Sequence, residues 1–463
     1  MEGKPRTLRK LGKLERFSSV RHALGYYNNV GVTATYVLKT RPTSLEASIY
    51  AAFKGAIDAH PALSAITVDE LTDAYFVQAP SIDLSKVIRF VERRRAPESC
   101  ASEDQELDEI LQSEHNTRFL PSEGEEHPPA LWRAVVSSHP SSPTHVTISF
   151  IYHHSIGDGL SGLVIQRSLA SSLTDPATLA ISTPQPLAPS PPTHALSPPM
   201  ESLLPLPLSL PFLLRALWSD WFPSRPKGIW TGMPATTPLA VRFRSFSFTP
   251  HETKSFAAAC KTQQTSLTAG FQVVIAAALF EALPGEWETL GCTVPVSLRR
   301  FVRGEEKARA EETMGVVVAS VNTAYTRSGT KSEDRAAFWA EARRSRDEVT
   351  KLVKKDGRDT NSGLLRYVSD VHEFFAGKVG KERGDSFEVS SLGVVRGEGM
   401  GRAVFSQSAT VTGPAVEVGI MTGGDGCLSV GVTWQEGVVD EEVVRKVVEI
   451  SRELIRDLGT EKI

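Results

Sequence analysis

The alternation of apolar and polar residues divides the first 175 residues into short strands and amphipathic helices. Short runs that alternate or are continuously apolar predict strands, and apolar residues at helical spacing behind a capping residue predict helices. Strands are predicted at 30–38, 62–68, 75–78, 87–91, 131–137 and 145–152, and helices at 44–60 and 103–115. The second of these helices is acidic, which predicts a face turned to solvent. Strands alternating with helices favour an α/β layer with a mixed sheet.

The same plan starts again after residue 240. A strand at 240–249 runs into a helix whose start carries a capping box of Thr249 and Glu252. The stretch 266–280 is apolar on nearly every side, which predicts a buried helix. Further strands are predicted at 290–296, 314–322, 387–395, 403–412, 415–422 and 427–435, and helices at 334–354, 361–375 and 440–458.

A proline-rich stretch separates the two halves. Fifteen of the 29 prolines fall between residues 175 and 238, so extended or irregular backbone is expected there. We therefore predict an N-terminal lobe at 1–175, a crossover linker at 176–239 and a C-terminal lobe at 240–463.

Within this linker, residues 203–222 are strongly apolar and include Trp218 and Trp221. One interpretation is a flap that touches a membrane or a lipid droplet through these tryptophans. The prolines, which break any long amphipathic helix, favour the other: a connection packed on the protein's own surface.

Composition excludes several classes of function. With 463 residues, 41% of them hydrophobic and 23% charged, the chain has the make-up of a globular protein. A net charge of −3 provides no field that would recruit nucleic acid. Residues 1–10 are polar, without an apolar signal region, and no run of 18 uncharged apolar residues predicts a spanning helix. The scattered cysteines make a disulfide framework or a zinc site unexpected and favour a reducing, cytoplasmic location. They are Cys100, Cys260, Cys292 and Cys427.

The strand at 145–152 ends in the residues that carry candidate chemistry. His153 and His154 follow it directly, then a turn with Gly157, Asp158 and Gly159, then a predicted helix. Because alternate residues of a strand face opposite sides, one histidine can reach a cavity while the other packs inward. Histidine suits a general base near neutral pH. Structural histidines beside a turn, or metal ligands lacking a third donor, are the alternatives.

In this turn, Asp158 would either hold the imidazole or anchor the turn to a distant arginine. Gly157 and Gly159 would supply backbone angles and a close chain approach that a β-carbon forbids.

The pattern His-His-x-x-x-Asp-Gly resembles the signature of the acyltransferase superfamily that includes chloramphenicol acetyltransferases and peptide-synthetase condensation domains. The segments 11–30, 294–299 and 432–440 look most like its fungal alcohol acetyltransferase branch. The resemblance implies two chloramphenicol acetyltransferase-like lobes, each a mixed sheet flanked by helices, with an active-site tunnel at their interface. It also implies a monomer that transfers an acyl group, most simply acetyl, from acyl-CoA to an alcohol or a hydroxylated secondary metabolite.

Roles for individual residues follow from the same resemblance. His154 would be the general base, and Asp158 would point away from the substrate toward an arginine, for which we prefer Arg299. Arg300, Arg303 and Lys307, together with Arg309, are candidate contacts for the phosphates of coenzyme A. Acetyl-CoA is the expected co-substrate, and no metal is expected.

Three other activities would use the same motif. An N-acyltransferase would acylate an amine. A condensation-type enzyme would need a carrier-bound donor, and a cyclase-like descendant would bind ligand with the motif idle. The sequence does not identify the acceptor.

Overall fold

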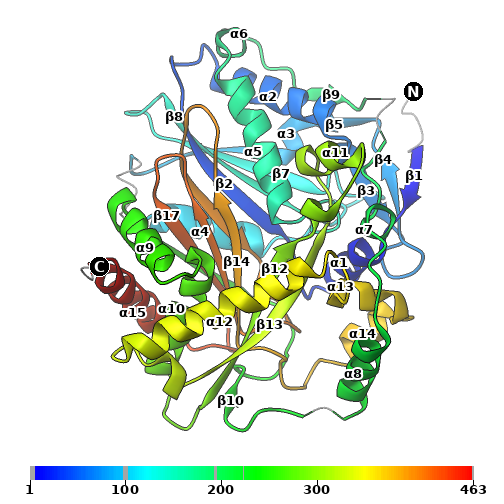
Figure 1. Cartoon of the computed structure of the whole chain (residues 1–463). Coiled ribbons are helices and arrows are strands. Elements are labelled where there is room, and N and C mark those ends of the chain that lie inside the picture. The colour runs from blue at the N-terminus through cyan, green and yellow to red at the C-terminus, as the bar shows by residue number, and fades with distance from the viewer. Residues whose placement is uncertain (1–5, 97–102, 192–194, 223, 461–463) are drawn as a thin grey trace.

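The computed structural model describes residues 6–96, 103–191, 195–222 and 224–460. Over these ranges the chain forms two lobes, each built on a mixed β-sheet with helices packed against it (Figure 1). This confirms the predicted α/β class.

The first lobe is built on a five-stranded sheet with strand order β15-β2-β8-β7-β6. The β6–β7 pair is parallel and the other pairs are antiparallel. Helices α2 and α5 pack against each other, and α5 covers β2. A small sheet, β1-β4-β3, and the pair β5–β9 complete the lobe. The elements are β1 Arg6–Lys10, α1 Lys13–Ala23, β2 Val30–Val37, α2 Leu45–Ala59, β3 Ala65–Val68, β4 Tyr75–Gln78, β5 Ser81–Asp83, α3 Leu84–Val87, β6 Ile88–Glu92, α4 Gln105–His115, β7 Trp132–Ser138, β8 His145–Tyr152, α5 Gly159–Leu173, β9 Leu187–Pro189 and β15 Met400–Gln407.

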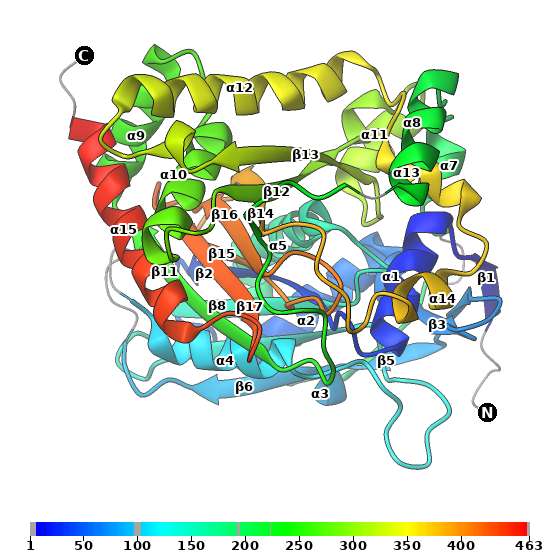
Figure 2. The ribbon, with the colours of Figure 1, turned by 90° about the horizontal axis from the view of Figure 1, so that it is seen from below.

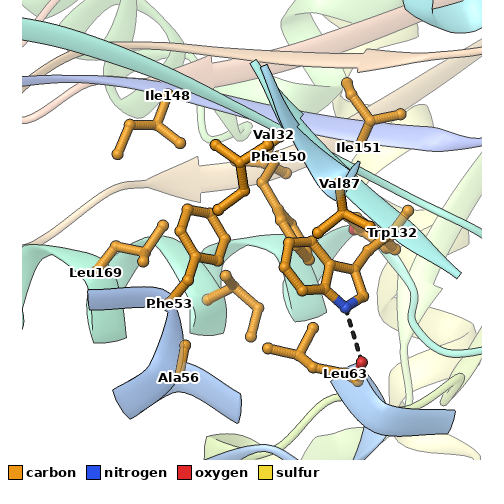
Figure 3. Close-up of a cluster of buried hydrophobic side chains, with 14 of the residues drawn as sticks. Val32, Phe53, Ala56, Leu63, Val87, Trp132, Ile148, Phe150, Ile151 and Leu169 are labelled. Atoms are coloured by element: carbon orange, nitrogen blue, oxygen red, sulfur yellow. Dashed lines mark hydrogen bonds between the residues drawn. The ribbon is translucent and has the colours of Figure 1, made fainter. Parts of the chain in front are cut away.

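Aromatic rings fill the core between this sheet and its helices (Figure 3). Phe53 of α2 stacks on Trp132 of β7, with ring centroids 5.2 Å apart and planes 4° from parallel. The indole N–H of Trp132 donates to the carbonyl of Leu63 at 2.8 Å, so the one polar atom of this buried side chain is satisfied. Helix α2 begins as predicted, with Ser44 accepting from the backbone N–H of Ala47.

The second lobe is a seven-stranded sheet of order β10-β12-β14-β16-β17-β11, with β13 paired to β12. Helix α10 packs against α9, α12 and α15, and these four lie together on one side of the sheet (Figure 1). All positions of α10 from Ala269 to Phe280 are buried, and the capping box of Thr249 and Glu252 is present, which confirms both predictions. The elements are β10 Ile229–Trp230, β11 Val241–Phe248, α9 Pro250–Thr262, α10 Leu267–Ala282, β12 Thr289–Ser297, α11 Glu306–Glu312, β13 Val318–Thr326, α12 Arg335–Lys354, α13 Asn361–Leu364, α14 Val371–Ala376, β14 Phe387–Val394, β16 Val416–Thr422, β17 Leu428–Gln435 and α15 Glu441–Thr460.

The long helix predicted at 361–375 is wrong. The chain forms the short helix α13, a 3-10 turn at Leu365–Tyr367 and then α14. A new helix starts at α14 because Asp370 has extended backbone and its side chain caps the N–H of Glu373.

Two connections tie the lobes together. Strand β15 comes from the second half of the chain but pairs with β2 in the sheet of the first lobe. In the other direction, α4 of the first lobe lies along β11, an edge strand of the second sheet. The predicted solvated face of this acidic helix is therefore wrong on one side: Asp108, Gln112 and Asn116 accept hydrogen bonds from the backbone N–H groups of β11.

The proline-rich connection contains the short helices α6 (Pro176–Leu179) and α7 (Met200–Leu203) and the longer α8 (Leu210–Trp221). Leu204 and Leu206 are buried against the protein, as the favoured interpretation predicts. That interpretation is wrong for α8, which lies at one end of the molecule (Figures 1 and 2). Its side chains Trp218 and Trp221 are exposed.

Two further predictions concern disulfides and membranes. Cys427 is disulfide-bonded, contrary to the expectation from the scattered cysteines, whereas Cys260 and Cys292 are free and buried. Cys100 lies outside the described residues. Among the described residues no single helix has the length and hydropathy to cross a bilayer, and only α9 and α10 taken together, across a bend of 101°, meet that test.

Candidate active site

The histidine motif lies where a central strand meets a helix. Strand β8 is buried at every position after His145 and pairs with β2 and β7. The backbone N–H of His153 makes a last bond, to the carbonyl of Leu131 at 2.8 Å, and the chain then turns into α5. The hydroxyl of Tyr152 fixes this turn, since it donates to the carbonyl of Asp158 at 2.6 Å and accepts from the N–H of Gly162 at 3.2 Å.

Asp158 joins the turn to the second lobe. Nη1 of Arg299 donates to both of its carboxylate oxygens, at 2.6 and 2.7 Å, and both side chains are almost completely buried. The backbone N–H of Val317 donates to the same carboxylate at 3.1 Å. Asp158 also caps α5 by accepting from the N–H and the hydroxyl of Ser161. Arg299 is thus the arginine placed opposite Asp158, and the carboxylate is fully occupied by structural contacts.

His154 lines a cavity of about 300 Å³ between the lobes. The walls come from α1, β2, β15 and the motif on one side, and from β12, β13, β14 and β16 on the other. Nδ1 of His154 is buried without a partner on another residue. Burial and the positive charge of Arg21 lower the pKa of His154 to about 4. The ring is therefore neutral at pH 7 and keeps a lone pair with which to accept a proton.

His153 packs inward, opposite to His154, and faces Glu70. Nε2 of His153 and Nδ1 of His22 each lie 3.5 Å from this carboxylate, so the three side chains have the spacing of a metal site. The other nitrogen of each ring accepts a hydrogen bond from the backbone. His153 Nδ1 accepts from the N–H of Ser155 at 2.9 Å, and His22 Nε2 accepts from the N–H of Phe119 at 3.0 Å. The nitrogen that faces Glu70 then carries the N–H in each ring, so it offers no free lone pair to an ion.

The charges of this cluster fit that assignment. Burial lowers the pKa of His22 to about 4, so this ring is neutral near pH 7. Burial raises the pKa of Glu70, but the interactions with His153 and His22 outweigh it and hold that pKa well below its usual range. The cluster is therefore a carboxylate set between two imidazoles, and it places the first histidine of the motif beside Glu70.

The two glycines are required for close packing. A β-carbon on Gly157 would lie 2.6 Å from Cβ of Ser161, and one on Gly159 would lie 2.7 Å from a methyl of Leu392. Neither has a positive φ. The expected special backbone angles are therefore wrong, and the expected close approach is present.

The candidate coenzyme A contacts lie outside the cavity lining. Arg300, Arg303 and Lys307 are exposed on the segment that leads from β12 into α11, and Arg303 forms an ion pair with Asp356. Their contact with phosphates stays a prediction.

The residues of the cavity wall that were not predicted from the sequence include Arg21, Tyr27, Glu388 and Glu417. Glu417 carried a usable signal, since it is the only charged residue in an otherwise apolar strand, residues 415–421. Arg21 and Tyr27 carried no such signal, because they are far from the histidine motif along the chain and reach the cavity only in the folded protein.

Comparison with known proteins identifies similar chains. The family profile described as "Alcohol acetyltransferase" matches residues 10–454. A probable alcohol acetyltransferase, crmB, of Aspergillus fumigatus is 32% identical over 459 residues, covering 94% of this chain and 96% of that protein. The probable alcohol acetyltransferase FCK4 of Fusarium pseudograminearum is 24% identical, covering 99% of this chain and 97% of that protein.

Solved structures share the fold. The trichothecene 15-O-acetyltransferase TRI3 of Fusarium sporotrichioides superposes with a TM-score of 0.70 at 14% identity, over 97% of this chain and 95% of TRI3. The first condensation domain of the CDA synthetase gives a TM-score of 0.66 at 13% identity, over 100% of this chain and 97% of that one. The two-lobed fold is therefore that of chloramphenicol acetyltransferase-like enzymes.

Proposed function

The chain belongs to the alcohol acetyltransferase family and is an acyltransferase, and on that premise we propose that it transfers an acetyl group from acetyl-CoA to a hydroxyl, with His154 as general base. The observation that carries the proposal is the position of His154. Its ring is neutral and borders the cavity between the lobes. The turn that carries it is held by Tyr152 on one lobe and by Arg299 on the other.

In the proposed reaction the acceptor hydroxyl attacks the thioester carbonyl while the imidazole of His154 takes its proton. The new C–O bond forms, the C–S bond breaks, and the coenzyme A thiolate leaves and recovers the proton from His154. Positioned proton transfer of this kind is worth roughly 10² to 10⁴ in rate. Binding both substrates in one cavity adds an entropic advantage. Asp158 takes no part in the proton transfer, because its oxygens are engaged by Arg299, Ser161 and Val317.

The test is mass spectrometry of alcohol and amine panels incubated with acetyl-CoA. We expect His154→Ala to lower product formation by roughly 10² to 10⁴ and to unfold at the same urea concentration as the native chain. His372→Ala, at an exposed position of α14, is the matched control and should retain full activity. Near-full turnover by His154→Ala would refute its role as base.

The same panel, repeated with a carrier-bound donor in place of acetyl-CoA, separates the alternatives. Products on amines alone would indicate an N-acyltransferase. Turnover of a carrier-bound donor, with none of free acetyl-CoA, would indicate a condensation-type enzyme. Binding without any acyl product would indicate a cyclase-like or idle descendant.

We also propose that the enzyme is cytoplasmic and that α8 holds it at a membrane surface. Leu210, Leu214, Leu217, Trp218 and Trp221 are each between 40% and 69% exposed. Their spacing places them on one face of the helix, and tryptophan is favoured where apolar and polar phases meet. Co-sedimentation with phospholipid vesicles measures this contact.

A further inference from the structure

Two glutamates occupy one row of the cavity wall. Glu388 on β14 and Glu417 on β16 are register partners in a parallel pair, so their side chains leave the same face of the sheet. Their sequence neighbours, such as Phe387 and Val418, point to the opposite face and belong to the helix-covered core. Both glutamates line the cavity that holds His154.

This carboxyl pair is incompletely satisfied by the protein. Oε1 of Glu388 accepts from the side-chain amide of Gln407 at 3.0 Å. Glu417 is only 3% exposed, and its Oε2 has no hydrogen-bond partner among the residues that the structure describes. Neither glutamate forms an ion pair with any residue that the structure describes. A buried carboxyl oxygen without a partner is costly, so a cavity that retains one is suited to a ligand that supplies the missing donor.

The pKa values of both carboxyl groups are raised. Burial, followed by the neighbouring Glu388, raises the pKa of Glu417 well above its usual value, and burial raises that of Glu388. A cationic or hydrogen-bond-donating ligand stabilises carboxylates that are otherwise hard to ionise.

Arg21 of α1 bounds the same cavity. Its guanidinium lies 4.6 Å from the ring centre of Tyr27 and 5.0 Å from that of Phe17, and its Nε has no hydrogen-bond partner. The positive charge of Arg21 acts on both glutamates and partly offsets the effect of burial on their pKa values. Arg21 makes no ion pair with either of them among the described residues, so the carboxyl oxygens remain available to a ligand.

We propose that Glu388 and Glu417 select acceptors that carry a second hydrogen-bond donor, a hydroxyl or a protonated amine, beside the group that is acylated. This inference rests on the proposed acyl transfer at His154. The pair faces the acceptor and not the donor, because coenzyme A phosphates would be repelled by carboxylates. A cavity of about 300 Å³ is at the small end of ligand pockets, so the part of the acceptor that it encloses is compact.

The test compares three acceptors of equal size: 1-pentanol, 1,4-butanediol and 4-amino-1-butanol. For each, kcat/KM is measured with acetyl-CoA at saturation, and the diol value is corrected for its pair of equivalent hydroxyls. We expect the native chain to prefer the diol or the amino alcohol over 1-pentanol by about tenfold to a hundredfold, the effect of a hydrogen bond to a charged group. Preference for 4-amino-1-butanol alone would indicate a cationic acceptor. Preference for both 4-amino-1-butanol and 1,4-butanediol would indicate an acceptor with a second hydroxyl.

Glu417→Gln and Glu388→Gln preserve side-chain size and should each reduce this preference about tenfold. The control Glu453→Gln, at an exposed position of α15, should keep the native ratio. The inference is overturned if the native chain shows no preference, or if both cavity variants slow all three acceptors by the same factor.

Failure of the proposed function would be recognised separately. If none of the acceptors is acetylated, ligand-detected NMR of 4-amino-1-butanol with the native chain and with Glu417→Gln still tests the site. Binding that is lost in Glu417→Gln supports the carboxyl pair, and equal binding to both proteins refutes it.

Discussion

Replacing Asp158 by alanine should destabilise the whole chain, because it leaves a buried charge without its partner. Arg299 uses all five of its N–H groups: two on Asp158 and one each on Ser161, Ala310 and Gly315. The side chains of Asp158 and Arg299 are only 7% and 5% exposed, so water cannot replace the lost carboxylate. Removing one partner of a buried ion pair costs about 3–5 kcal/mol. Part of that loss is the N-cap of α5, worth about 1 kcal/mol.

Equilibrium urea unfolding measures this effect as a lower midpoint, and acyl transfer should fall with it because the turn that carries His154 loses its anchor. Asp158→Asn keeps an acceptor for the helix cap but still leaves the Arg299 charge uncompensated, so it should lose most of the same stability. The control is Asp73→Ala, which breaks the Lys10–Asp73 pair, 73% and 78% exposed, and should barely move the midpoint. Suppose that Asp158→Ala has the same urea midpoint as the control and yet has no activity. Asp158 would then act in the chemistry, and its assignment as a structural residue would be wrong.

Two further predictions concern the surfaces of the lobes. Burial raises the pKa of Asp108 from 3.8 to about 7. Between these two pH values the folded chain therefore binds more protons at Asp108 than the unfolded chain does. The folded state loses stability as the pH rises from the lower value to the higher one. Asp108→Asn removes the titration, so its stability relative to the native chain should improve from about pH 5 to about pH 8 in urea unfolding; a constant difference would contradict the shift. For α8, the double variant Trp218→Ala, Trp221→Ala should no longer co-sediment with vesicles, and its acyl transfer to a soluble alcohol should be unchanged. The control replaces Leu71 and Tyr367, which are exposed on other elements, by alanine and should still co-sediment. Equal sedimentation of all these chains would exclude α8 as the contact.

The parts of the fold that could be predicted from the sequence are those encoded by near neighbours. The strand, turn and helix around His154 follow from a run of β-formers, two glycines and a resumed helical spacing. The capping box at Thr249 is likewise contained in four consecutive residues. Asp370 was an equally local signal, and it was missed because the apolar residues on both sides of it continue a helical spacing.

The parts that could not be predicted depend on partners far along the chain. Nothing in residues 400–407 indicates that they pair with β2 and not within the second lobe. Helix α4 is more instructive. Asp108, Gln112 and Asn116 repeat every four residues, about 6 Å along a helix, and meet Ser245, Phe243 and Val241, which repeat every two residues, about 6.6 Å along a strand. Polar side chains on such a helical face can form hydrogen bonds to water or to a strand edge. Only the folded structure shows which of the two partners they have.

Three ties join the lobe that carries His154 to the lobe that carries Glu388 and Glu417. Strand β15 joins one sheet while packing against β16 and β17 of the other, α4 closes the edge at β11, and Asp158 binds Arg299 across the interface. Each tie is a backbone ladder or a saturated polar contact, so sliding one lobe over the other would break several hydrogen bonds together. His154, Glu388 and Glu417 therefore line one cavity between two lobes that are held together, His154 on the first lobe and the two glutamates on the second. On the roles proposed above, substitutions on β14 and β16 should change which acceptor is held and leave His154 in place, because the residues that fix His154 lie on different elements.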